Sequence, residues 1–168
     1  MTGPSTLTEP RLRAPKREDA ACIHRLVLDS EALEANTRYA YLLLATHFAD
    51  TAIVAVQAGE VVGFVAAYRP PIRPESVFVW QVGVASSARG RGLARRMLVA
   101  LLRRPACAGV KYLEATVGTS NAASRRLFTS VARTLDVPCH VGPGFEAGDF
   151  GDEAHEAEDL FRIGPLKR

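Results

Sequence analysis

Long apolar runs are missing from this sequence. Although 48% of its 168 residues are hydrophobic, Arg, Gln or Gly interrupts every stretch well before the roughly 18 apolar residues that a membrane-spanning helix needs. Residues 1–16 are rich in polar residues and proline and lack the apolar core of a secretory signal. We therefore expect a cytoplasmic protein that does not bind membranes.

Cysteine is scarce as well, with three copies in the chain. None belongs to a Cys-x-x-Cys pair, so we expect neither a disulfide framework nor a zinc site, and we interpret the cysteines as small buried apolar residues: Cys22, Cys107 and Cys139. The four histidines are not spaced as metal ligands, and no metal is expected: His24, His47, His140 and His155.

Acidic residues are almost absent from the middle of the chain. Residues 61–135 hold 12 basic and 2 acidic residues, whereas residues 1–60 hold 6 and 8 and residues 136–168 hold 3 and 8. The net charge of +3 therefore conceals local charges of −2, +10 and −5. Such a pattern suggests a polyanion bound centrally and a cationic ligand near the ends. A nucleic acid is disfavoured, because the arginines gather at one loop and helix without interleaved surface aromatics.

The order of apolar patterns predicts one mixed α/β domain. Apolar residues spaced by three and four predict helices, and β-branched runs predict strands. We expect helices over residues 17–33, 39–48, 92–104 and 120–133, and strands over residues 52–56, 61–68, 76–84, 111–117, 137–141 and 159–163. Residues 1–11 are expected to be a flexible tail, and residues 12–168 the single domain, in which antiparallel strands precede a β-loop-α-β-α unit.

The junction after the strand at residues 76–84 carries the clearest chemical signal. It reads ASSARGRGLARR over residues 85–96. A glycine-bearing loop between a strand and a helix presents unpaired backbone N–H groups and the positive end of the helix dipole at one point, which favours phosphate. The loop matches neither Gly-x-Gly-x-x-Gly nor the P-loop, so nicotinamide cofactors and nucleoside triphosphates are not indicated.

The same loop resembles the Arg/Gln-x-x-Gly-x-Gly/Ala motif of the GNAT acetyltransferase superfamily, with Arg89, Gly92 and Ala94 at its fixed positions. The resemblance implies a mostly antiparallel central sheet flanked by helices, with acetyl-CoA as cosubstrate. It places the pyrophosphate on the amides of residues 89–95 and the pantetheine along residues 82–84. Asn121 would contact the pantetheine arm, or would only cap a helix. The cofactor residues implied are Val82, Val84, Arg89, Gly90, Arg91, Gly92, Leu93, Ala94, Arg95 and Asn121.

Four further segments resemble the L-2,4-diaminobutyrate N4-acetyltransferases of ectoine biosynthesis. They span residues 36–51, residues 62–84, residues 109–116 together with 120–128, and residues 155–166. They include the sequences YRPP, WQV and HEAE. The resemblance implies N4-acetylation of L-2,4-diaminobutyrate by direct attack of the amine on the thioester, and a homodimer. The alternative is a superfamily member that acetylates another small amine, such as a polyamine or an aminoglycoside.

A diamine substrate needs acidic groups to hold ammonium and a base to remove a proton. With the family likeness, we expect Glu34 and Glu158 to grip the amines and Tyr39 and Trp80 to form walls, although Glu34 could be ordinary surface and Trp80 pure core. The base is Glu158 or His155, and the sequence does not decide between them. The oxyanion would meet a backbone N–H near Val84, where a bulge at Gly83 would open a donor.

One position departs from the superfamily pattern. Many members have a tyrosine seven residues after the asparagine, as the acid for the leaving thiolate, but here the residue is Phe128. Another group, such as Tyr112 or water, would have to supply the proton, or coenzyme A leaves as the anion. A cysteine nucleophile is not supported, because no matched Cys/His/Asp arrangement exists.

Overall fold

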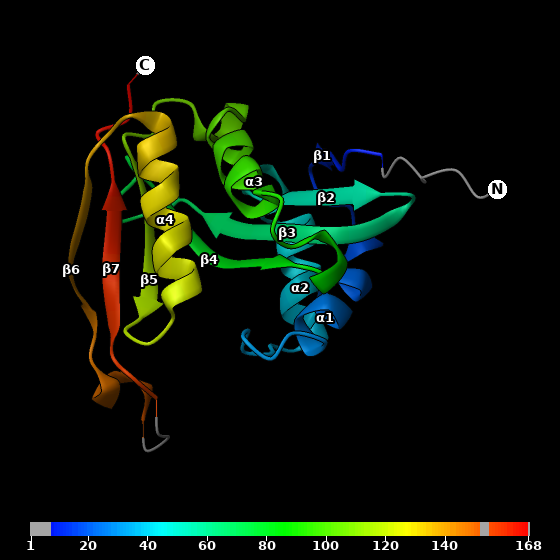
Figure 1. Ribbon diagram of the computed structural model, residues 1–168, viewed down its shortest axis with the longest axis horizontal. Coiled ribbons are helices and arrows are strands. Elements are labelled where there is room, and N and C mark those ends of the chain that lie inside the picture. Colours follow the sequence, from blue (N-terminus) through cyan, green and yellow to red (C-terminus); the bar gives the residue numbers. More distant parts are fainter. Residues whose placement is uncertain (1–7, 152–154, 168) are drawn as a thin grey trace.

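A seven-stranded mixed sheet forms the centre of the molecule (Figure 1). The structure is a computed structural model that describes residues 8–151 and 155–167. The elements are β1 (Arg11–Arg13), α1 (Asp19–Leu28), α2 (Arg38–Thr46), β2 (Ile53–Gln57), β3 (Glu60–Tyr68), β4 (Ser76–Val84), α3 (Leu93–Leu102), β5 (Tyr112–Gly118), α4 (Ala122–Leu135), β6 (Cys139–Phe145) and β7 (Glu158–Ile163). The strand order is β1-β2-β3-β4-β5-β7-β6, and β4–β5 is the parallel pair among antiparallel ones. The expected mostly antiparallel sheet is confirmed.

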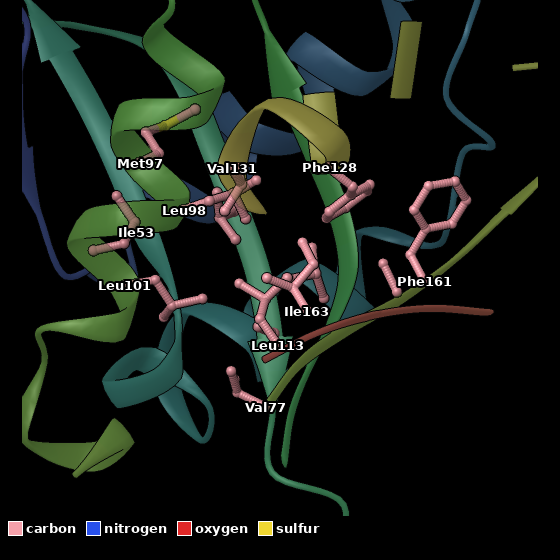
Figure 2. Close-up of a cluster of buried hydrophobic side chains, with 14 of the residues drawn as sticks. Ile53, Val77, Met97, Leu98, Leu101, Leu113, Phe128, Val131, Phe161 and Ile163 are labelled. Atoms are coloured by element: carbon pink, nitrogen blue, oxygen red, sulfur yellow. The ribbon is translucent and has the colours of Figure 1, made fainter. Parts of the chain in front are cut away.

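Helices cover both faces of the sheet. In Figure 1, α3 and α4 lie on the face toward the viewer, and Figure 2 shows how Leu98 and Leu101 of α3 and Val131 of α4 pack with Leu113 of β5 and Ile163 of β7. A second apolar cluster joins α1 and α2 to the opposite face of β2 and β3. The three- and four-residue spacing of the apolar side chains places them on one face of each helix. Burial of that face against the sheet stabilises the helices.

The central strand β4 is bent by a bulge. The pairing of β3 with β4 runs Ala66 to Gln81 and then Ala67 to Val79, so Trp80 is the extra residue. Pairing of β4 with β5 stops at Phe78. Since a bulge bends its strand and increases the local twist, β4 diverges from β5 beyond this point and leaves an opening between them.

The expectation of a bulge at Gly83 is wrong. Gly83 pairs regularly with Phe64, and a Cβ there would lie 2.7 Å from Cε1 of Phe64 and 2.9 Å from Cδ1 of Leu33. The glycine is required by the close packing of α1 and the following loop on β4, because no side chain fits in that space.

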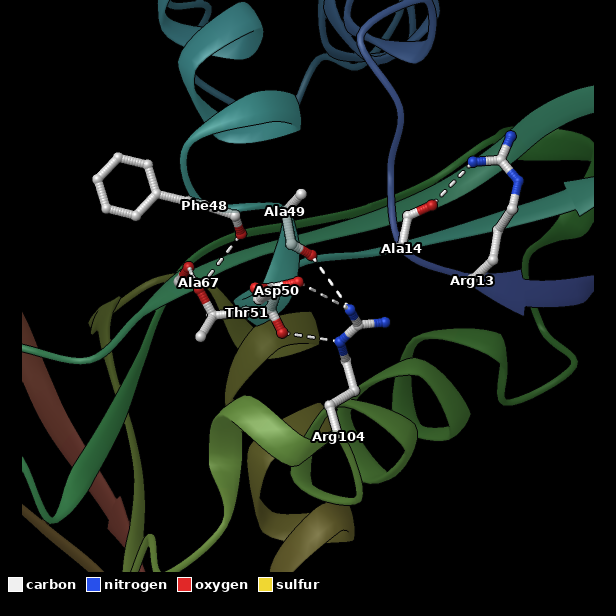
Figure 3. A network of polar contacts seen from close by, with 8 residues as sticks. All are labelled: Arg13, Ala14, Phe48, Ala49, Asp50, Thr51, Ala67 and Arg104. Atoms are coloured by element: carbon white, nitrogen blue, oxygen red, sulfur yellow. Dashed lines mark hydrogen bonds and ion pairs between the residues drawn. The ribbon is translucent and has the colours of Figure 1, made fainter.

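Several arginines of the basic middle hold the fold together. Arg104 donates from Nε to the carbonyl oxygen of Asp50 at 2.7 Å and from Nη2 to that of Ala49 at 3.4 Å, which ties the turn at Ala49–Thr51 to the end of α3 (Figure 3). Arg73 of the basic middle lies 3.4 Å from the fully buried carboxylate of Glu114, and Arg162, from the acidic last block, lies 3.5 Å from it on another side. Part of the +10 charge is therefore structural.

The largest differences between the predicted and the observed elements are three. The first helix ends at Leu28 rather than residue 33, β6 continues to Phe145, and the short strand β1 was not predicted. Residues 1–7 of the expected tail lie outside the described residues. No helix in the described ranges is long and apolar enough to cross a membrane.

Candidate active site

A cleft of about 600 Å³ opens where β4 leaves β5. It joins the end of β4, the loop into α3 and the start of α4, and it takes in nine of the ten residues predicted to bind the cofactor. Its lining includes Val82, Val84, Arg89, Gly90, Gly92, Leu93, Ala94, Arg95 and Asn121. Arg91, the tenth, is exposed in the same loop and is not among the lining residues.

The start of α3 supplies backbone donors to this cleft. Gly90 and Gly92 have φ angles of +76° and +70°, in the left-handed region that glycine adopts without cost. The N–H of Arg96 is the first to bond back, to the carbonyl oxygen of Gly92 at 3.0 Å, so the N–H groups of the preceding helical residues have no intrahelical partner. With the positive end of the helix dipole, they form an anion site of the kind that phosphate needs.

Strand β4 supplies donors from its free edge. The N–H of Ala85 donates to the carbonyl oxygen of Val62 on β3 at 2.9 Å. Successive N–H groups of a strand point to opposite sides, and the pairing of Val82, Gly83 and Val84 with β3 is regular. The N–H groups of Val82 and Val84 therefore point away from β3 and into the opening.

Asn121 is a helix cap, one of the two interpretations that the sequence left open, and it lies in the cleft where the other would place it. It caps α4, since its Oδ1 accepts from the N–H of Ser124 at 3.0 Å, and it lines the cleft. Arg89 folds back so that its Nε donates to the carbonyl oxygen of Val84 at 3.0 Å, and the guanidinium of Arg95 lies beside Gly92. The cleft thus combines a donor-rich loop with two cationic side chains, a set suited to a pyrophosphate.

His155 and Glu158 lie together before and at the start of β7. Nε2 of His155 is 4.0 Å from Oε1 of Glu158, and its Nδ1 is 2.7 Å from the carbonyl oxygen of Glu156. Because a carbonyl oxygen only accepts, Nδ1 carries the proton, and Nε2 of the neutral ring has the free electron pair. The ring also stacks on Phe150 at 3.8 Å between centroids. In this tautomer the unprotonated Nε2 of His155 faces Glu158.

The other predicted substrate residues come from α2, its preceding loop and β4. Tyr39 lies on the first turn of α2 and is 67% exposed, Trp80 forms the bulge of β4 and is 40% exposed, and Glu34 is exposed in the loop before α2. Trp80 is not pure core. None of the side chains predicted to hold or deprotonate the substrate lines the 600 Å³ cleft: Glu34, Tyr39, Trp80, His155 and Glu158.

A buried amide that the sequence analysis did not single out holds the Glu34 loop. Nε2 of Gln81 donates to the carbonyl oxygen of Glu34 at 2.8 Å, and Oε1 of Gln81 accepts from the hydroxyl of buried Tyr41 at 3.0 Å. The tyrosine oxygen accepts in turn from the N–H of Asn36 at 3.4 Å. Gln81 follows the bulge residue Trp80 directly in β4. The loop that carries Glu34 is therefore bound to the same part of β4 that carries Trp80.

The position of Phe128 offers no proton to the site. The ring is 3% exposed and packs beside Phe161 in the core. Tyr112 is no replacement, because it pairs with Ser76 at the opposite end of β4. Ser76 is six residues from Val82, which corresponds to about 20 Å along a strand. The guanidinium of Arg162 also covers its ring at 3.8 Å. The structure therefore does not support Tyr112 as the acid for the thiolate.

Comparison with known proteins agrees with this geometry. A family model described as Acetyltransferase (GNAT) family matches residues 17–131, more than half of the chain. The chain belongs to the GNAT acetyltransferase family. This acetyltransferase is 44% identical to the diaminobutyrate acetyltransferase EctA from Paenibacillus lautus, whose solved structure is a complex with its substrate L-2,4-diaminobutyric acid and coenzyme A. The match covers 96% of this chain and 98% of that one, with a TM-score of 0.91.

Two relatives known by sequence are also L-2,4-diaminobutyric acid acetyltransferases. This acetyltransferase is 43% identical to an L-2,4-diaminobutyric acid acetyltransferase of Shouchella clausii, over 96% of this chain and 88% of the relative. It is 45% identical to the protein of that name from Bordetella parapertussis, over 97% and 88%. The fold and family expected from the sequence are confirmed.

Proposed function

We propose that this acetyltransferase transfers the acetyl group of acetyl-CoA to the 4-amine of L-2,4-diaminobutyrate, and that its product is cyclised to ectoine, an osmolyte. The single observation that carries the proposal is the 44% identity and the TM-score of 0.91 to an enzyme whose structure contains diaminobutyrate and coenzyme A. The cleft fits the cofactor chemically, because the helix-start amides suit the pyrophosphate and the free edge of β4 suits the pantetheine amides.

The reaction needs a neutral amine. An alkylammonium group is mostly protonated at pH 7 and cannot attack a carbonyl carbon. We assign proton removal to Nε2 of His155, whose Nδ1–H is already donated to the carbonyl oxygen of Glu156, and leave Glu158 as an anionic anchor for ammonium. When bound, acetyl-CoA supplies an activated acetyl thioester. The amine would attack its carbonyl carbon directly, and the N–H of Val84 would stabilise the oxygen that gains negative charge. The C–S bond would then break and release coenzyme A as the thiolate, which takes a proton from water or leaves as the anion.

The remaining substrate roles follow the same proposal. Glu34 would hold the second amine from the loop fixed by Gln81, and Tyr39 and Trp80 would wall the substrate, since both present large exposed aromatic surfaces. Arg91 would contribute charge from the same loop as Arg89 and Arg95. Residues 12–168 would act as one catalytic domain.

The proposal extends to assembly and location. β6 is an edge strand of the sheet, and its Val141 and Phe145 are 48% and 49% exposed. Exposed apolar side chains on a sheet edge are typical of an interaction surface, which supports a homodimer. We place the enzyme in the cytoplasm, where acetyl-CoA is available as cosubstrate.

A substrate panel tests the reaction. Initial rates with acetyl-CoA would be compared for 2,4-diaminobutyrate, 2,3-diaminopropionate, ornithine and spermidine, and NMR would locate the acetyl group. One methylene more or less changes kcat/KM by about 10- to 200-fold, so we expect diaminobutyrate to exceed both homologues by at least about 10-fold. A preference for spermidine would assign the enzyme to another amine class.

A further inference from the structure

The carboxylate of Glu156 accepts three hydrogen bonds, more than that of Glu34 or Glu158 among the described residues. The donors are the N–H of Ser120 at 2.9 Å, the Ser120 hydroxyl at 2.7 Å and the Thr119 hydroxyl at 2.8 Å. Thr119 and Ser120 form the turn between β5 and α4, directly before Asn121 of the cofactor cleft. The Glu156 side chain therefore fastens the segment before β7 to the turn that carries a cofactor residue.

The same residue orients the proposed base through its backbone. The carbonyl oxygen of Glu156 accepts from Nδ1 of His155 at 2.7 Å, which fixes the tautomer and directs Nε2 to Glu158 at 4.0 Å. The backbone of a residue cannot shift freely while its side chain is held by three donors. The position of the accepting carbonyl is thus set by the side-chain contacts.

A glycine makes room for this arrangement. Gly118, the last residue of β5, pairs with Glu158, and a Cβ on Gly118 would collide with the Glu156 carboxylate. The end of β5 is therefore shaped to admit the carboxylate, and any side chain at residue 118 would displace it.

We propose that Glu156 is a positioning residue of the reaction, which holds His155 in its base tautomer and orientation by anchoring residues 155–158 to Thr119 and Ser120. The inference rests on the proposed function, because it assumes that His155 takes the proton from the amine. It assigns Glu156 no contact with substrate or cofactor.

The two sides of this contact depend on it unequally. The turn before α4 has further bonds of its own, since the N–H of Asn121 donates to the carbonyl oxygen of Gly118 at 3.1 Å and Asn121 caps the helix. Among the described residues, His155 is held by its stacking on Phe150, by the bond to the Glu156 carbonyl and by the 4.0 Å approach to Glu158, and β7 begins at Glu158. Loss of the Glu156 side chain should therefore move His155 and leave the cofactor cleft nearly unchanged.

Four variants separate this role from a general structural one. Glu156→Ala removes all three bonds, whereas Glu156→Gln keeps most of them, because the two hydroxyls can rotate to accept from its amide. Thr119→Val with Ser120→Ala removes the side-chain donors from the other partner. Asp159→Asn is the matched control, since it removes the charge from a nearby polar contact between α4 and β7, the Arg125 ion pair at 2.8 Å.

The kinetic readout is kcat/KM for the amine beside KM for acetyl-CoA. We expect Glu156→Ala to lower kcat/KM for the amine by about 100-fold, the typical cost of a displaced catalytic group. KM for acetyl-CoA should change by less than about 3-fold. Glu156→Gln should recover most of the loss, and Asp159→Asn should match wild type. Combining Glu156→Ala with the Thr119/Ser120 pair should add little, because both break one contact. Additive losses, or equal losses for amine and cofactor, would overturn the inference.

A readout without turnover separates this inference from the function. In ¹⁵N NMR spectra, His155 should carry its proton on Nδ1 in wild type and lose this preference in Glu156→Ala. If wild type acetylates diaminobutyrate but the tautomer and kinetics do not change in the variant, the positioning role is wrong and the function stands. If the tautomer changes as expected while diaminobutyrate is not a substrate, the proposed function fails and the anchor stands.

Discussion

Two glycines shape the loop that opens α3, and their backbone angles explain why the residue type matters there. Gly92 precedes the first turn of α3 with a φ of +70°. A Cβ at this position would lie 3.3 Å from Nη2 of Arg95, beside the amides that we assign to the pyrophosphate. A substitution would therefore affect both the loop conformation and a neighbouring cation.

We predict that Gly92→Ala raises KM for acetyl-CoA by at least about 10-fold. Gly109→Ala is the control, because Gly109 has a similar φ of +76° with open space around it and lies outside the lining of the cleft. Both variants place an alanine in the left-handed backbone region, which lowers the free energy of unfolding by about 1–2 kcal/mol. Their melting temperatures should therefore fall by similar amounts. Equal KM values in the two variants would refute the assignment of the loop.

Residues that belong to a pattern along the chain were visible in the sequence, and residues that act on distant segments were not. The glycine loop and Asn121 carry a motif, and nine of ten such residues line one cleft. Gln81 and Glu156 act on backbone carbonyls and N–H groups of distant segments. No spacing along the chain encodes such contacts, because they depend on which loops the fold brings together.

At the scale of the elements, β4 could be located from its sequence, but its shape could not. Its bounds, Ser76–Val84, are those predicted, because a run that is apolar on both faces is typical of a central strand. The bulge at Trp80 depends on the register with β3, which is a tertiary property. The first helix was overextended: the chain leaves it after Leu28 and enters a loop in which Nε2 of Gln81 donates to the carbonyl oxygen of Glu34 and the N–H of Asn36 donates to the hydroxyl oxygen of Tyr41.

The packing of α1 on β4 gives a prediction for Gly83. An alanine Cβ would meet Phe64 at 2.7 Å, Leu33 at 2.9 Å and Leu26 at 3.1 Å. Such overpacking costs about 1–3 kcal/mol, so Gly83→Ala should lower the free energy of unfolding by that amount. Gly142→Ala on β6 is the matched strand control, because its Cβ would meet nothing within 4 Å. Urea unfolding of both variants tests this, and equal midpoints would contradict it.

At the scale of the whole molecule, the uneven charge has two functions. Arg89 and Arg95 of the basic middle line the cofactor cleft, while Arg104 bonds the turn after α2 and Arg125 pairs with Asp159 of the acidic end. Charge counting locates a basic region but does not distinguish these roles, since a guanidinium can donate to a phosphate, a carboxylate or a carbonyl oxygen. The distinction required the fold.

One ion pair links the first strand to the first helix and makes stability depend on pH. Asp19, at the start of α1, is 7% exposed. Arg13 of β1 donates to its two carboxylate oxygens at 2.6 and 2.9 Å, and the N–H of Lys16 donates at 2.6 Å. Burial alone would raise the pKa of Asp19, but the bonds from Arg13 and Lys16 outweigh it and hold the pKa below 3.8.

A carboxyl group whose pKa is lowered by folding stabilises the protein fully above its unfolded pKa, and this contribution disappears as pH falls through the folded value. We therefore predict that Asp19→Asn costs about 1–3 kcal/mol at pH 7, lowering Tm by roughly 2–12 °C, and that the difference from wild type shrinks below pH 4. Asp136→Asn is the control: the bond from Lys167 also lowers the pKa of Asp136, but that pair is largely exposed, so its removal should change Tm little. Thermal unfolding of the three proteins from pH 7 to pH 3 tests this, and an Asp19→Asn difference that stays constant over the range would mean that the Arg13 pair does not link stability to pH.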